Sequence, residues 1–333
     1  MPKTTSRKST HEADSVPYRR PTRRGTRNPN TVKEHSDRYW SKKVETNRIF
    51  VDTTPGRYMD MKMSGKKLTE ALAVDYPEGS SNLKRAPANG RLIVEGMSLT
   101  KDLKPTVTTV LRRFVDIIQA NEREEIEKLW LLMQQRGLKY RKGEGSNRSA
   151  TPAIHVGVWE KFANQPRLTA ETWKMQNSVV KELMSELIGL LSAKVAPRMV
   201  AILRTFYPEV WKRQQQALYR VRTVLADEFT SMPWLDFGGA FFAVAIKTGS
   251  SERDHLDWSD DKLGLTWVSG VGEWEGADLR ALETGFQYPL RAGEAILANM
   301  RQMVHSASPI SNGQRITLTF FTCSFLARHS ELK

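Results

Sequence analysis

Two histidines and one aspartate have the types and spacing needed to bind a single metal ion. His255 and Asp257 are separated by one residue, so in an extended segment both side chains point to the same side of the chain. His305 follows 50 residues later, in a segment that also reads as extended. Two imidazoles and one carboxylate on one face of an ion are the ligand set typical of non-haem iron(II), because the opposite positions stay open. A histidine and an aspartate at this spacing are more often a surface pair when they stand alone.

Arg315, ten residues after His305, adds a group that suits the same site. A guanidinium binds a carboxylate through two parallel hydrogen bonds, so it can hold a dicarboxylate cosubstrate while the open metal positions accept that cosubstrate and O2. The other histidines fit less well. His155 lies between Ile154 and Val156 and is predicted to be structural, and we expect three to lie on the solvated surface: His11, His35 and His329.

The C-terminal third has the pattern of a β sandwich or barrel, because short extended runs alternate with Gly, Asp, Asn and Pro. In the last run, Ile316, Leu318 and Phe320 recur at every second position, as in a strand with one buried face. Asn312-Gly313 predicts a hairpin that would set the strands of His305 and Arg315 antiparallel, side by side. The runs are Ala240–Ile246, Leu263–Val268, Gly285–Leu290, Ala295–Ala298, Met303–His305 and Arg315–Phe321.

Helical spacing dominates the middle of the chain, where apolar residues recur three or four positions apart. Gly137, Pro197 and Pro208 are predicted to mark helix boundaries. We expect these helices to support the β region, and their stripes run over Val107–Ile118, Ile126–Met133, Val179–Leu191, Met199–Phe206 and Leu218–Leu225.

The positive charge is concentrated at the N-terminus. The 333 residues carry a net charge of +14, and residues 1–43 hold 12 basic and four acidic side chains, a net +8. This segment is rich in Ser, Thr, Pro and Asn and reads as a disordered basic arm, suited to phosphate contacts or, through Arg19–Arg27, to nuclear import. A solubilising tail is the alternative. No apolar run is long enough to span a bilayer, and the single cysteine, Cys323, excludes an intrachain disulfide framework.

The stretch Ala240–Phe325 resembles the double-stranded β-helix core of 2-oxoglutarate- and iron(II)-dependent dioxygenases. Its Trp-rich run after Asp257 and the helical stretch before the core look most like the fungal branch of the TET/J-binding-protein dioxygenases, which oxidise 5-methylcytosine or thymine. The resemblance is carried by His255-x-Asp257, Gly272-Glu-Trp274-Glu-Gly276, Pro289-Leu-Arg-Ala-Gly293, Val304-His305 and Gly313-Gln-Arg315-Ile-Thr317.

The resemblance implies a role for each matching residue. His255, Asp257 and His305 would bind Fe(2+), Arg315 would pair with the distal carboxylate of 2-oxoglutarate, and the Thr317 hydroxyl would join Arg315. Two departures from the family pattern, Ser259 and Ala277, leave the ligands intact and bear on substrate choice. Among the nearby tryptophans, Trp258 directly follows a ligand and is the candidate substrate contact, by stacking on an extruded base, whereas Trp267 and Trp274 are predicted to be structural.

The expected fold is α+β: a C-terminal double-stranded β-helix (jelly-roll) core supported by N-terminal helices. The expected parts are the arm (1–43), a mixed extension (44–104), a helical support region (105–235) and the dioxygenase core (236–328). The expected function is oxidation of a methylated DNA base that depends on Fe(2+), 2-oxoglutarate and O2, with 5-methylcytosine as the preferred base. The protein is expected in the nucleus, with DNA as its partner and without membrane binding.

Three alternatives stay open. An AlkB-like demethylase of N6-methyladenine is disfavoured by Phe321, where those enzymes carry a second arginine. A prolyl hydroxylase would have a lysine in place of Arg315. A catalytically silent DNA-binding accessory protein would use only the arm.

Overall fold

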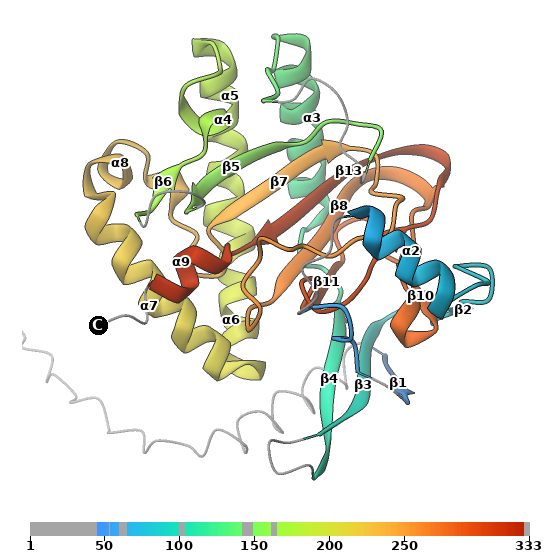
Figure 1. Cartoon of the computed structure of the whole chain (residues 1–333). Helices are drawn as coiled ribbons and strands as arrows, with labels where there is room; N and C mark the ends of the chain where they lie inside the picture. The colour runs from blue at the N-terminus through green and yellow to red at the C-terminus, as the bar shows by residue number, and fades with distance from the viewer. Residues whose placement is uncertain are drawn as a thin grey trace, which may run out of the picture.

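A computed structural model of the chain describes residues 45–52, 54–59, 65–99, 104–141, 149–160 and 165–329. The predicted arm, residues 1–43, lies outside this set. Figure 1 shows a sheet-based body with most helices gathered on one side, and the predicted α+β class is confirmed. Within the described residues, no helix combines the length and apolar character that crossing a bilayer requires.

Nine strands form one large sheet, in the order β1-β3-β4-β11-β8-β13-β7-β5-β6. Its centre is the antiparallel set β11, β8, β13 and β7, whose residues carry four of the six predicted β runs. The bounds are β1 Thr46–Val51, β3 Arg91–Leu99, β4 Pro105–Phe114, β5 Ile154–Trp159, β6 Arg167–Leu168, β7 Ala243–Thr248, β8 Thr266–Gly276, β11 Ala295–Ala298 and β13 Ile310–Phe321.

A second, four-stranded sheet packs on one face of the large one. Its order is β12-β9-β10-β2, with bounds β2 Lys84–Arg85, β9 Leu279–Ala281, β10 Phe286–Tyr288 and β12 Ser306–Ala307. Leu279 and Tyr288 from this sheet share a buried cluster with Leu111 and Ile296 of the large sheet. The two facing sheets are the predicted double-stranded β-helix.

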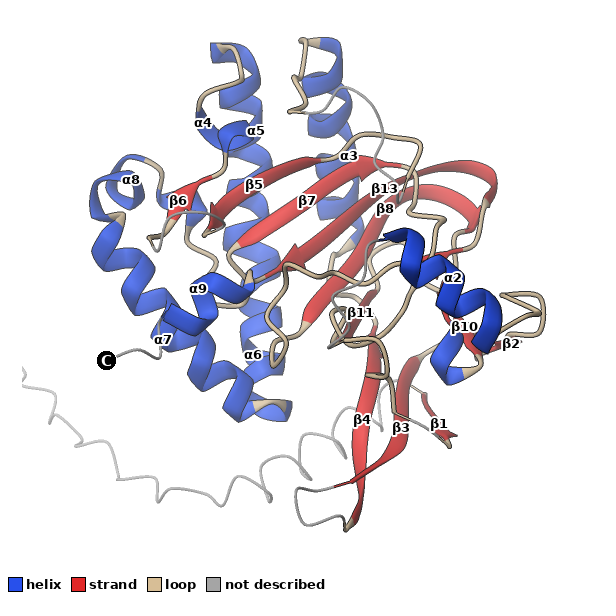
Figure 2. Cartoon of the chain, viewed as in Figure 1, coloured by secondary structure: helices blue, strands red, loops and turns tan. Residues whose placement is uncertain are grey.

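Helices cover the opposite face of the large sheet (Figure 2), whereas α2 (Gly65–Asp75) lies apart from them and shares a buried cluster with Leu256 and Val304. Ile316, Leu318 and Phe320 of β13 are buried on the helix-covered face against Trp130 and Leu187, as the alternating pattern predicts. The bounds are α2 Gly65–Asp75, α3 Ala120–Gln135, α4 Ala170–Trp173, α5 Ser178–Leu190, α6 Ala196–Phe206, α7 Pro208–Val224, α8 Ala226–Ser231 and α9 Ser324–His329, with a π-turn over Leu191–Val195.

The predicted helix boundaries in this layer are confirmed. Gly137 adopts a positive φ of 84° just beyond the end of α3, where a residue without Cβ is favoured. Pro208 begins α7, a position where proline has no amide hydrogen bond to lose, and Pro197 lies in the first turn of α6, directly after the π-turn.

The helix predicted over Val107–Ile118 is wrong, since Val107–Phe114 belong to the ten-residue strand β4. The apolar spacing of three and four is real, but Thr106-Val107-Thr108-Thr109-Val110 is an unbroken run of β-branched residues. Such side chains lose rotamer freedom in a helix and pack well on a pleated sheet. The preference of these residues for a strand therefore outweighs the helical period.

The hairpin predicted at Asn312-Gly313 is also wrong. Both residues lie inside β13, opposite Glu275 and Trp274 of β8, with a register shift beside Asn312. Gly313 has a φ of 77°, and a Cβ there would lie 2.1 Å from the Glu273 carbonyl oxygen. A β-bulge uses positive φ as a turn does, so Asn-Gly marks an irregularity within the strand. The segments of His305 and Arg315 consequently enter different sheets.

Candidate metal centre

The backbone brings the two predicted histidine ligands together directly. His255 and His305 form an isolated antiparallel bridge in which each amide donates to the carbonyl of the other at 3.0 Å. The next ligand is held in the same way, because the Asp257 amide donates to the Met300 carbonyl at 3.1 Å. The extended run predicted over Met303–His305 is thus a single bridge, and it is enough to align the ligands.

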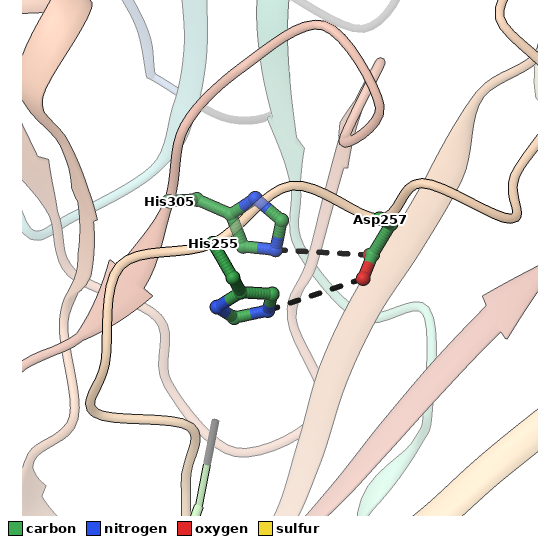
Figure 3. A group of neighbouring side chains, drawn as sticks. All are labelled: His255, Asp257 and His305. Carbon is green, nitrogen blue, oxygen red and sulfur yellow. Dashed lines mark ion pairs between the residues drawn. The ribbon is translucent and has the colours of Figure 1, made fainter. Parts of the chain in front are cut away.

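The three side chains converge on one point, as Figure 3 shows. The Nε2 atom of His255 lies 3.9 Å from Asp257 Oδ1, and that of His305 lies 3.7 Å from Asp257 Oδ2. One donor atom from each residue falls within 4.8 Å of the others. The two Nε2–carboxylate distances exceed a hydrogen bond, so the donors surround a common space of the size that a metal ion takes.

The other ring nitrogens fix the orientation of both imidazoles. His255 Nδ1 lies 2.7 Å from the Arg253 carbonyl oxygen, and His305 Nδ1 lies 2.9 Å from that of Met303. A carbonyl can only accept, so each Nδ1 carries the proton and each Nε2 presents a lone pair to the site. Two such nitrogens and one carboxylate oxygen fit iron(II).

Residues far earlier in the chain cover the outside of this centre. Leu256, between two ligands, and Val304, next to the third, are buried in one cluster with Tyr58, Leu68 and Leu72. The last two lie on α2, so the segment predicted as a mixed extension supports the metal ligands from behind.

Glu283 is a site residue that sequence reasoning missed. Its Oε2 accepts a hydrogen bond from the Val304 amide at 2.8 Å and its Oε1 accepts from the Gly56 amide at 3.1 Å. Burial raises the pKa of this carboxyl, while the backbone donors oppose the rise. Glu283 therefore ties the N-terminal segment to the loop of His305. A single glutamate carries no spacing signal that could have revealed this role.

Arg315 is enclosed on the sheet face that meets the small sheet. Only 2% of the residue is exposed; its Nη1 donates to the Ala277 carbonyl at 2.9 Å, and its guanidinium lies 5.1 Å from the centre of the Trp274 ring. Burial lowers its pKa to about 10. Its buried Nε has no hydrogen-bond partner among the described residues, so the group retains a donor for a ligand.

Gly270 makes room for this arginine, because a Cβ there would lie 2.8 Å from Arg315 Nε and 3.1 Å from the Trp274 ring. A buried guanidinium with an unused donor, beside a space that one methyl group would fill, fits the carboxylate of 2-oxoglutarate. Thr317 projects from the same face, but its hydroxyl donates to the Gly249 carbonyl at 2.6 Å and is not joined to Arg315.

The three tryptophans have separate surroundings. Trp258 is partly buried against the cluster of Leu256 and Val304, and its role as a substrate contact stays a prediction. Trp267 is fully buried on the helix-covered face, whereas Trp274 covers Arg315.

No family model matches the sequence, and no curated protein matches it either. Solved structures do show likeness. NgTET1 in complex with 5mC DNA is 12% identical, with 80% of this chain and 93% of that chain covered and a TM-score of 0.45. A 2OG-Fe(II) oxygenase family protein from Burkholderia pseudomallei is 14% identical (65% and 84% covered, TM-score 0.37). A Pseudomonas putida prolyl-4-hydroxylase is 9% identical (64% and 91% covered, TM-score 0.33).

These structures are thus a TET protein, a 2OG-Fe(II) oxygenase and a prolyl hydroxylase. Kinship with the fungal branch in particular stays a prediction. The ligand set of this chain, two histidines and one carboxylate with donor atoms within 4.8 Å of one another, is the set typical of non-haem iron(II) oxygenases.

Proposed function

We propose that the protein is a 2-oxoglutarate- and iron(II)-dependent oxygenase. The observation that carries the proposal is the convergence of His255, Asp257 and His305, with both Nε2 atoms turned towards one carboxylate. A pair of surface residues would not be held by a backbone bridge and two Nδ1 contacts. The buried Arg315, on the face of the large sheet that meets the small sheet, supplies the cation that the cosubstrate needs.

Each part of the site has a distinct task. When bound, iron(II) and 2-oxoglutarate together supply oxidation by O2, with release of succinate and carbon dioxide. The triad would hold the ion and leave coordination positions for the cosubstrate and oxygen. Arg315 orients the cosubstrate by its distal carboxylate. Leu256 and Val304, buried behind the ligands, keep water from reaching the site from that side.

We further propose that the substrate is a methylated DNA base, with 5-methylcytosine as the favoured one. A base must leave the helix to reach an enclosed metal, and it is then stacked against aromatic side chains. The register provides such side chains. His155 lies opposite Ala245, which lies opposite Thr319, so His155 projects from the same face as Thr319, Phe321 and Arg315.

His155, Trp159 and Phe321 form an aromatic cluster. The ring centres of His155 and Trp159 are 5.5 Å apart, and each lies 6.2 to 6.3 Å from that of Phe321. The cluster lies on the metal-side face, beside the segment that follows Asp257, since the Asp261 amide donates to the Thr322 carbonyl at 2.9 Å. A planar heteroaromatic substrate suits this surface.

The test is a nucleoside analysis of methylated duplexes. Wild-type protein with iron(II), 2-oxoglutarate and oxygen is incubated with DNA that carries 5-methylcytosine or N6-methyladenine, and products are measured by mass spectrometry. We expect oxidised 5-methylcytosine and stoichiometric succinate, and neither product with His255→Ala or Asp257→Ala. Loss of N6-methyladenine alone would favour the AlkB-like alternative. Metal binding without succinate on any substrate would favour the silent DNA-binding protein.

We also propose a nuclear location. It rests on the basic cluster Arg19–Arg27, which lies outside the described residues. A fluorescent fusion of the whole chain is expected in the nucleus, and replacing the five arginines of this cluster with glutamine is expected to release it into the cytoplasm. An unchanged distribution would contradict the proposed role of this cluster in nuclear import and leave the proposed oxygenase activity standing.

A further inference from the structure

Lys247 is a second buried cation next to Arg315. It lies on β7 directly opposite Thr317, while Gly249 aligns with Arg315 across the same strand pair. Lys247 and Arg315 are therefore diagonal neighbours on one sheet face, a separation that long side chains span. Lys247 is 7% exposed and Arg315 2%. The charges of the two side chains lie close enough for Arg315 to lower the pKa of Lys247.

Neither cation is neutralised by the protein around it. Lys247 Nζ donates to three neutral oxygens: the Ser149 hydroxyl, the Ser250 carbonyl at 2.7 Å and the Ser251 hydroxyl at 3.5 Å. Arg315 has a carbonyl and an aromatic ring as partners. In the part of the chain that the structure describes, no carboxylate forms an ion pair with either residue.

Two adjacent buried cations without a counter-ion are unfavourable, since each loses hydration and repels the other. An anion placed between them removes both costs. The pKa of Lys247 falls to about 8, mainly because of burial and then because of Arg315, with Glu252 acting in the opposite direction. Asp278 opposes the fall in the pKa of Arg315 and is not among the groups that act on Lys247. Lys247 and Arg315 together therefore lack a neutralising negative charge.

We propose that Lys247 and Arg315 form a two-cation pocket for the distal carboxylate of the cosubstrate, in which Lys247 strengthens binding through its charge. This inference rests on the proposed function and deepens it. Its consequence is a linkage: a bound carboxylate favours the protonated lysine, so above pH 8 the protein takes up a proton when the cosubstrate binds.

A purely structural role is the competing explanation, because Lys247 also ties the Ser149 segment to the loop that leads to His255. The two roles are separable. Lys247→Gln removes the charge and keeps a hydrogen-bond donor, whereas Ser149→Ala removes a tether contact and keeps the charge. Lys247→Arg keeps the charge in a larger group. Thermal unfolding checks that each variant is folded.

The experiment is calorimetric binding of 2-oxoglutarate to manganese(II)-loaded protein without oxygen, at pH 7 and pH 9, in buffers of different ionisation enthalpy. We expect Lys247→Gln to weaken binding at pH 7 tenfold or more, to leave manganese binding unchanged, and to abolish the proton uptake seen at pH 9. Ser149→Ala should change affinity less than threefold, and Lys247→Arg should bind more tightly than Lys247→Gln.

Equal affinity of the wild type and Lys247→Gln, with wild-type binding intact, would overturn the role of Lys247 and leave the oxygenase proposal standing. An equal loss in Ser149→Ala and Lys247→Gln would assign the lysine to loop support and overturn the role of its charge. A wild-type protein that binds manganese but no 2-oxoglutarate would overturn the proposed function itself, and the two-cation pocket with it.

Discussion

Gly270 shows how one missing side chain decides what a residue beside it can bind. Because a Cβ at this position would press on the inner nitrogen of Arg315 and on Trp274, Gly270→Ala must displace the guanidinium or the ring. Misplacing a group that orients a reactant by a fraction of an ångström is costly. We expect at least a tenfold rise in the KM for 2-oxoglutarate, measured by succinate release. Gly65→Ala, where nothing lies within 4 Å, is the matched control and should leave that KM unchanged.

Phe321 tests the aromatic cluster at the same scale. Phe321→Leu keeps an apolar side chain but removes the ring that faces His155 and Trp159. Base stacking on an aromatic side chain contributes about 1–3 kcal/mol, so we expect the KM for methylated DNA to rise roughly tenfold. Calorimetric affinity for 2-oxoglutarate should stay within twofold of the wild type. A change in cosubstrate affinity with no change for DNA would place Phe321 in the cosubstrate site.

At the scale of elements, Glu283 links the metal centre to the segment before α2. Each oxygen of this carboxylate accepts a different backbone amide, and glutamine has only one acceptor oxygen to offer. Glu283→Gln should therefore lower metal affinity about tenfold, as loss of a residue that orients a ligand does, with a lower midpoint of thermal unfolding. Titration with manganese(II) measures the first effect.

The control for this substitution is Glu70→Gln, on the exposed side of α2. A surface ion pair contributes little to stability, so this variant should bind manganese like the wild type. If Glu283→Gln also binds manganese normally, the N-terminal segment covers the site without positioning its ligands.

How far the sequence predicts these elements depends on how local their signals are. The triad was predictable, because His255 and Asp257 share a face over two residues, and the alternation in β13 is equally local. The strand β4 was harder to predict, because its apolar residues have a helical spacing while its β-branched side chains favour a strand. Lys247 and Glu283 left no signal, because each acts on a partner distant in sequence: Arg315 for Lys247, and Gly56 for Glu283.

At the scale of the whole molecule, the large sheet separates two kinds of packing. One face carries the helical layer with Trp130 and Trp267 in its core, while the other bears the small sheet, Arg315 and the aromatic cluster. The strands of the large sheet come from both halves of the chain, since β1, β3, β4, β5 and β6 precede residue 236. The metal centre thus depends on contacts between segments far apart in sequence. The charge of residues 1–43, in contrast, can be removed without changing any of these segments.

Removing residues 1–43 tests what that charge does. The segment holds a net +8 of the +14 carried by the chain, and each phosphate that it neutralises steepens the fall of DNA affinity with salt by about 0.9 in a log–log plot. We expect the truncated protein to bind DNA more weakly at low salt and with a slope shallower by several units, while affinity for 2-oxoglutarate stays unchanged. Replacing the twelve basic residues with glutamine at full length should reproduce the effect, because charge and not length is responsible. An unchanged slope in both variants would assign DNA binding to the folded part, whose remaining charge is +6.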